Sequence, residues 1–277
     1  MTIELAPYRP PVPPALTAPM GASSLGLDEL TPVSLAELVE HAALLHRTDR
    51  KYIVDLNTVR ALVAQLSQSH RVLEIAGRRS TTYQTLYFDT ADFAACRSHI
   101  QGRRRRWKAR SRMYVEDGLC RIEVKTKDNR GGTNKSMGPS HPDRYGTLAG
   151  DELAFVDDCL SAEHPELDVS TLGPTAEITY VRATLVDLVS GTRVTIDWNL
   201  HCRMETGHMW LDGQYALIET KGPAVPSVAG RALVVLSSRP RSFSKYVAAI
   251  STMHPDVPDN DVRLLKGRVL HYVAATR

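Results

Sequence analysis

The sequence predicts an α+β protein built on a closed antiparallel β-barrel with flanking helices. Near the N-terminus, apolar residues recur with helical spacing, whereas the middle of the chain alternates as strands do and carries tight-turn signals. Of the 277 residues, 43% are hydrophobic and 23% charged, which fits a globular protein with a sizeable core. No window approaches the roughly 18 uninterrupted apolar residues of a membrane helix. This composition disfavours full disorder, collagen-like repeats and a membrane span.

Residues 1–33 are expected to form a flexible, proline-rich arm. Five prolines between Pro10 and Pro19 fix the backbone and remove hydrogen-bond donors. The same stretch has no basic start followed by an apolar run, so it does not have the pattern of a secretory signal peptide. A cytoplasmic location is therefore expected. Residues 34–250 should form the folded domain, with 251–277 packing on it.

Helices are predicted where apolar residues repeat every three or four positions. The first begins after Ser34, a suitable N-cap, and the second begins near Leu56 with Asn57 or Thr58 as its cap. The first helix would bury Leu35, Leu38, Val39, Ala42 and Leu45, and the second Val59, Leu62, Val63 and Leu66. Two more helices are expected, over Asp151–Leu160 and after Ser242.

Strands are predicted where the period changes to two. The segments are Tyr83–Asp89, Arg106–Tyr114, Cys120–Lys127, Thr175–Val186, Arg193–Trp198 and Tyr215–Lys221. Turn signals such as Asp117-Gly118 and Asp212-Gly213 separate several of them, which favours antiparallel hairpins. The four cysteines are far apart in sequence and contain no Cys-x-x-Cys pair, so reduced thiols are expected.

Positive charge is concentrated on two of these strands. Residues 96–135 contain 13 Lys or Arg and four Asp or Glu, an excess of +9 in a chain whose formal net charge is +3. Alternation places Lys108, Arg110 and Arg112 on one strand face, with no acidic neighbour on that strand. These faces could simply be solvated. If they point inward, the barrel would have a basic lumen that holds a polyanion.

Three carboxylates interrupt the basic faces of the predicted strands. Glu123, Asp197 and Glu219 could be oxygen ligands for Mg²⁺ or Mn²⁺, since phosphate chains are handled with such ions. They could equally neutralise neighbouring lysines.

A series of short motifs follows in order along the chain: Arg50-Lys-Tyr52, Tyr87-Phe-Asp-Thr90, Lys-x-Arg-x-Arg at 108–112, Glu123-x-Lys125, Lys135, Tyr180-x-Arg182, Arg193-x-Thr-x-Asp197, Glu219-x-Lys221 and Ser244-Lys-Tyr246. In these motifs the sequence resembles the VTC domain, the polyphosphate polymerase domain of the CYTH-like triphosphate tunnel metalloenzyme superfamily. The resemblance covers about residues 47–248.

The resemblance implies roles for individual residues. Lys51, Arg110, Arg112, Lys125 and Lys221 would act in catalysis, Lys108, Lys135, Arg182, Arg193 and Lys245 would bind substrate, and Glu219, assisted by Glu123 and Asp197, would hold Mn²⁺ or Mg²⁺. The implied reaction transfers the terminal phosphoryl group of ATP to a growing polyphosphate chain. A metal-dependent inorganic triphosphatase and a non-catalytic polyphosphate- or triphosphate-binding module remain alternatives.

The sequence departs from the hydrolytic branch of that superfamily. Where the branch carries Glu-x-Glu-x-Lys, this chain has Arg47-Thr-Asp-Arg-Lys51, which favours transfer or binding over hydrolysis. With no membrane segment of its own, the chain would need a partner protein to meet a membrane. The run Arg103–Arg106 could bind a nucleic-acid backbone, but only Trp107 is interleaved with it, so no specific nucleic acid is expected as a partner.

Overall fold

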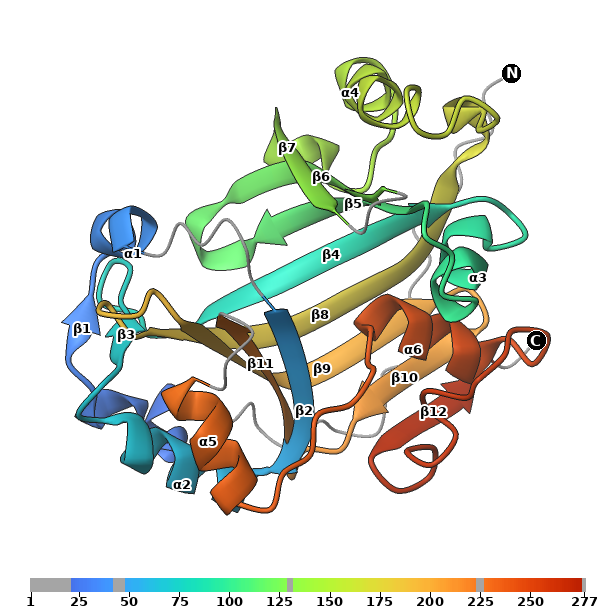
Figure 1. Cartoon of the computed structure of the whole chain (residues 1–277). Helices are drawn as coiled ribbons and strands as arrows, with labels where there is room; N and C mark the ends of the chain where they lie inside the picture. Colours follow the sequence, from blue (N-terminus) through green and yellow to red (C-terminus); the bar gives the residue numbers. More distant parts are fainter. Residues whose placement is uncertain (1–20, 42–47, 129–131, 223–226, 276–277) are drawn as a thin grey trace.

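The computed structural model describes residues 21–41, 48–128, 132–222 and 227–275 (Figure 1). The proline-rich stretch up to Pro19, and Ala42 and Leu45 of the first predicted helix, lie outside these residues. None of the described helices is long and apolar enough to cross a membrane. The chain folds around one extended, curved β-sheet with helices packed on it, which confirms the α+β class.

The strands belong to a single sheet. They are β1 (Pro32–Val33), β2 (Thr48–Asp55), β3 (Arg71–Leu73), β4 (Thr81–Asp89), β5 (Arg106–Tyr114), β6 (Leu119–Lys127), β7 (Thr133–Ser140), β8 (Gly173–Val186), β9 (Arg193–Met204), β10 (Gly207–Leu211), β11 (Tyr215–Gly222) and β12 (Leu270–Ala274). Their main order is β12-β10-β9-β8-β4-β5-β6-β7, and β11 branches from β9 to pair with β2. All of these pairings are antiparallel.

The curved wall that matters for the site runs β7-β6-β5-β4-β8-β9-β11-β2. Among the described residues no pairing joins β2 to β7, so the sheet is open at this seam, which corrects the predicted closed barrel. At one point on its free edge, β2 pairs with the segment before the last helix, because the Arg241 amide donates to the Lys51 carbonyl at 2.8 Å.

A bulge lets β9 continue past the predicted end at Trp198. The register with β8 shifts between Thr179 and Val181, and Asn199 takes a positive φ of 51°. Such a bulge resets the alternation of faces. Beyond it, β9 pairs with β10 instead of β11.

Six α-helices lie on the sheet within the described residues. They are α1 (Leu35–His41), α2 (Leu56–Leu66), α3 (Ala94–Ile100), α4 (Asp151–Leu160), α5 (Val228–Val235) and α6 (Lys245–Met253). Ser34 caps α1 as predicted, accepting a hydrogen bond from the Glu37 amide at 3.2 Å. The cap of α2 is Asp55, not Asn57 or Thr58, and it accepts from the Thr58 amide at 2.9 Å. A carboxylate at that position satisfies a free amide of the first turn.

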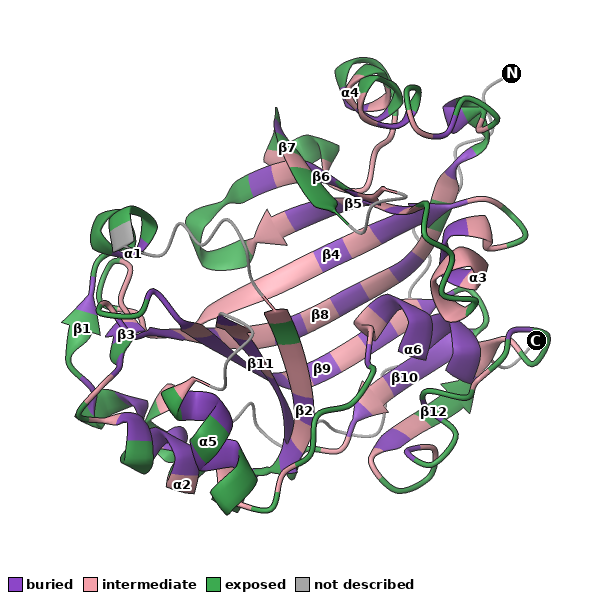
Figure 2. Ribbon diagram, in the orientation of Figure 1, coloured by how far each residue is buried: buried purple, intermediate pink, exposed green. Residues whose placement is uncertain are grey.

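The core divides between the two faces of the sheet (Figure 2). Helices α2 and α5 cover the outer face of β8, β9 and β11, while α4 covers that of β5 and β6. Leu25, Leu27 and Leu30 are buried in the first of these clusters, so residues 22–30 belong to the domain and not to a flexible arm. Their burial removes apolar surface from water, which outweighs the cost of ordering the segment.

The C-terminal part of the chain closes the other side of the core. Helix α6 packs against the apolar end of the inner face at Ile178 and Leu217, and β12 extends the sheet beyond β10. The thiols of Cys96, Cys120, Cys159 and Cys202 are free, as predicted.

Candidate functional site

Strand register places the predicted site residues on one face of the curved wall, called the inner face below. Alternate residues of a strand share a face, and directly paired residues of neighbouring strands point the same way. The directly paired residues are Lys51–Glu219, Arg193–Lys221, Arg182–Asp197, Arg110–Glu123, Lys108–Lys125 and Lys125–Lys135. Lys245, from the first turn of α6, reaches the same face through Asp197.

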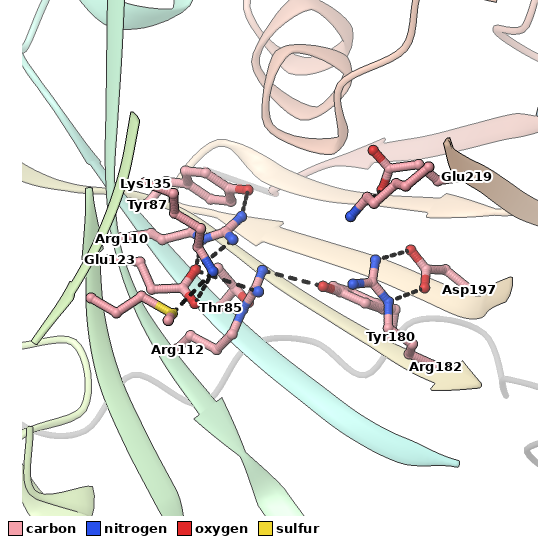
Figure 3. A network of polar contacts seen from close by, with 12 residues as sticks. Thr85, Tyr87, Arg110, Arg112, Glu123, Lys135, Tyr180, Arg182, Asp197 and Glu219 are labelled. Carbon is pink, nitrogen blue, oxygen red and sulfur yellow. Dashed lines mark hydrogen bonds and ion pairs between the residues drawn. The ribbon is translucent and has the colours of Figure 1, made fainter. Parts of the chain in front are cut away.

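Glu123 is the centre of the first charged cluster on the inner face (Figure 3). Its Oε2 accepts from Arg110 Nε at 2.7 Å and lies 3.4 Å from Arg112 Nη1, while its Oε1 accepts from Lys135 Nζ at 2.8 Å. Burial opposes its ionisation, but Arg110, Arg112 and Lys135 overcome this and hold the pKa of Glu123 well below its usual range. Both oxygens of Glu123 therefore contact cations of the inner face.

Asp197 is the centre of the second cluster. Arg182 donates to its two oxygens at 2.6 and 2.7 Å, and Lys245 forms an ion pair with it. Burial again opposes ionisation, yet Arg182 and Lys245 keep the pKa of Asp197 well below its usual range. Glu123 and Asp197 thus each contact several basic side chains, as expected of carboxylates that neutralise and orient cations. Their role as metal ligands stays a prediction.

Three tyrosines form a floor beneath the arginines of both clusters. Arg112 and Arg182 lie over the Tyr83 ring at 5.2 and 5.1 Å, and Arg110 lies over Tyr87 at 5.6 Å. Tyr83 also stacks on Tyr180, whose hydroxyl accepts from Arg112 Nη2 at 3.3 Å. Aromatic faces attract cations and restrict their rotamers. The sequence reasoning gave this floor no role, although the tyrosines share the strand period of the basic residues.

Glu219 differs from the other two carboxylates of the inner face. Its Oε2 lies 3.3 Å from Lys221 Nζ, whereas its Oε1 has no hydrogen-bond partner among the described residues. Burial alone would raise the pKa of Glu219, but the positive charges of Lys221 and Lys51 outweigh burial and lower the pKa to about 2. Glu219 is therefore an ionised carboxylate with one oxygen available.

The lysines of the inner face near the start of β5, near the end of β6 and on β2 have few acidic neighbours that compensate their charge. Lys108 donates to the Ser244 hydroxyl at 2.8 Å, and Lys51 donates to the Phe243 carbonyl at 2.8 Å. Burial and the neighbouring charges of Lys51 and Lys125 lower the pKa of Lys108 to about 7. Burial, Lys108 and Arg106 likewise lower the pKa of His99 to about 3. An anion placed here would meet an excess of positive charge.

The residues present fit a divalent ion held jointly with phosphates. Mg²⁺ is usually held by one or two carboxylates together with substrate phosphates. Glu219 offers such an oxygen, and the paired residue Thr195 has a buried hydroxyl with no partner in the described part of the chain. No group of three or more His, Cys, Asp or Glu that could hold a metal by itself occurs among those residues. A metal here would therefore need substrate oxygens as further ligands.

Over residues 46–254 the sequence matches the VTC domain. The chain belongs to the VTC domain family. No curated protein matches it. This VTC domain is similar in fold to a Hippeastrum protein reported as a candidate adenylyl cyclase with a dominant triphosphatase activity, with a TM-score of 0.50 and 15% identity over 75% of this chain and 96% of that one.

Weaker fold similarity extends to a Bacillus halodurans protein described as a candidate adenylate cyclase. It has a TM-score of 0.41 and 15% identity, covering 78% of this chain and 95% of that one. The PH1819 protein of Pyrococcus horikoshii has a TM-score of 0.40 and 10% identity, covering 74% of this chain and 98% of that one.

Proposed function

We propose that this VTC domain transfers the terminal phosphoryl group of ATP to the end of a polyphosphate chain bound on the inner face. The observation that carries the proposal is the combination of pre-positioned cations with one available carboxylate oxygen, on Glu219. In-line phosphoryl transfer depends mostly on positioning and charge neutralisation, which is what such a face supplies.

The chain's own residues would perform the binding and orientation. Arg110 and Arg112, fixed by Glu123 and the tyrosine floor, would bind the donor phosphates through planar guanidinium groups. Arg182, on β8, and Lys245, at the start of α6, would bind from the opposite side. A divalent ion at Glu219 would neutralise charge on the phosphate oxygens.

In the reaction, a terminal oxygen of the acceptor chain forms the new bond to the γ-phosphorus of ATP. The bond from that phosphorus to the bridging oxygen breaks, and ADP leaves with the electron pair. The attacking phosphate oxygen is already ionised, so the protein needs no general base. Lys108 and Lys125 would stabilise the charge that develops on the transferred group.

The first experiment incubates the purified full chain with ATP and Mn²⁺ and resolves products on a gel stained for polyphosphate, with orthophosphate assayed in parallel. We expect long chains from the wild type. Glu219→Gln should reduce chain synthesis about 100-fold or more, because the available carboxylate oxygen loses its charge. Glu205→Gln, at an exposed position in the β9–β10 turn, is the matched control and should retain synthesis.

A triphosphatase is the second candidate, favoured by the fold shared with the Hippeastrum protein. Release of orthophosphate without chain growth would establish it and contradict the polymerase. Neither product despite tight triphosphate binding would indicate a binding module.

A further inference from the structure

A small cavity adjoins the inner face where β5 begins and β6 ends. It has a volume of ≈ 110 Å³, and His99, Arg106, Lys108, Lys125 and Lys127 are among its lining residues. We call it the basic pocket. Lys108 and Lys125 belong both to this pocket and to the inner face, so the two are continuous.

The charges of the basic pocket are arranged in two cross-strand pairs of like sign. Arg106 is paired with Lys127, and Lys108 with Lys125 two positions further along the strands, a step of about 7 Å. Like charges directly opposite one another are destabilising. In the described part of the chain none of these four side chains forms an ion pair with a carboxylate, and Arg106 donates only to the Arg103 carbonyl, at 2.7 Å. Asp49 and Glu219 act on Lys125 only through longer-range attraction.

The size and lining of the basic pocket select the kind of anion. A cavity of ≈ 110 Å³ is well below the roughly 300–1,000 Å³ of sites for drug-sized molecules. It suits a phosphate group better than a nucleoside. Trp107, the aromatic residue of the lining, is 5% exposed and offers no stacking face for a base.

We propose that the basic pocket is a further phosphate-binding site, which holds the part of the polyphosphate chain that continues beyond the phosphates bound on the inner face. The inference rests on the proposed function only in taking polyphosphate as the ligand. The exposed residues Arg103 to Arg105 continue from Arg106 along the surface and extend the site outward. The arginine run would thus guide the inorganic polymer, not a nucleic acid.

The test compares affinities for inorganic triphosphate and for a long polyphosphate of several tens of phosphates, without ATP, so that no activity is required. The variant is Arg106→Ala with Lys127→Ala. The control, Arg71→Ala with Arg268→Ala, removes the same charge from exposed positions on β3 and before β12. Circular dichroism of each variant checks its fold.

We expect the variant to bind long polyphosphate about tenfold more weakly, with a shallower dependence of log Kd on log salt, while its triphosphate affinity changes less than about twofold. The control should bind both ligands like the wild type. Equal losses of polyphosphate affinity in the variant and the control, or no loss in the variant, would contradict the proposal that the basic pocket binds polyphosphate. A larger loss for a single-stranded RNA of matched charge than for polyphosphate would assign the arginines to nucleic acid instead. Failure of the wild type to bind triphosphate at all would overturn the proposed function itself.

Discussion

Two regions of the inner face carry its cations in different ways. In the compensated region, Glu123 and Asp197 fix the guanidinium groups of Arg110, Arg112 and Arg182. In the uncompensated region, Lys108 and Lys125 face each other without a carboxylate partner in the described residues. Fixed arginines need no reorganisation when an anion arrives. The lysines instead repel one another until the anion supplies the missing charge.

The largest effect on binding is expected when the arginines of the compensated region are removed. Arg110→Ala with Arg112→Ala should weaken triphosphate binding about 100-fold or more, because each arginine supplies a charge-assisted hydrogen bond of roughly 1.5–3 kcal/mol. Isothermal titration calorimetry measures the affinity. Unchanged binding by a variant with native circular dichroism would contradict the inward orientation of these side chains.

A smaller but still large effect is expected on stability when a compensating carboxylate is lost. Asp197→Ala leaves Arg182 and Lys245 without their partner in a position where Asp197 is 1% exposed. Breaking a buried pair from one side costs about 3–5 kcal/mol. Urea unfolding should show a fall of this size, and added triphosphate should restore part of it by binding the folded state. A change within about 0.5 kcal/mol would mean that the cluster is solvated.

The smallest effect on stability is expected in the uncompensated region, where removing a charge should stabilise the protein instead of destabilising it. The pKa of Lys108 lies near 7 in the folded protein instead of 10.5, so between these values the unfolded chain holds a proton that the folded chain lacks. The stability contribution therefore falls as the pH is lowered through this range. Lys108→Met should remove this loss and leave the protein at least as stable as the wild type near pH 7.

The same substitution should alter how binding depends on pH. Triphosphate favours the charged form of Lys108, so wild-type affinity should decline as the pH rises above about 7. We expect a few-fold loss of affinity at low pH in Lys108→Met and a flatter pH profile. Lys266→Met, at a lysine bound by Asp259 away from the inner face, is the control and should keep the wild-type profile. A wild-type profile in Lys108→Met would show that another group titrates.

The sequence predicted the strands best where alternation is regular. Arg106–Tyr114 and the helix Asp151–Leu160 match the structure to the residue. Strand β7 was missed because Gly138-Pro139 interrupts the alternation of its residues. Helix α3 was missed as a whole, because the amides of its first turn are capped from a distance, by the Asp89 carboxylate at the end of β4.

The candidate site was predicted unevenly, for a similar reason. Alternation alone indicates which residues share a face of a strand, and it identified the basic face of β5. It does not indicate which strand lies opposite, so the pairing of Asp197 with Lys245, 48 residues away, required the fold. The roles of individual residues came from the family resemblance and stay predictions. In the structure, Glu219 differs from Glu123 and Asp197 in its ion-pair partners.

The tyrosine floor has a practical consequence for measurement. Tyr83, Tyr87 and Tyr180 lie under the arginines of the inner face, whereas Trp107 and Trp198 are buried in the clusters on the outer face. An anion bound to these guanidinium groups would change the electric field at the rings beneath them, and so the ultraviolet absorbance of tyrosine, and would leave that of these two tryptophans nearly constant. The inner face thus contains its own chromophores, and a difference spectrum of the unlabelled protein can follow its occupancy.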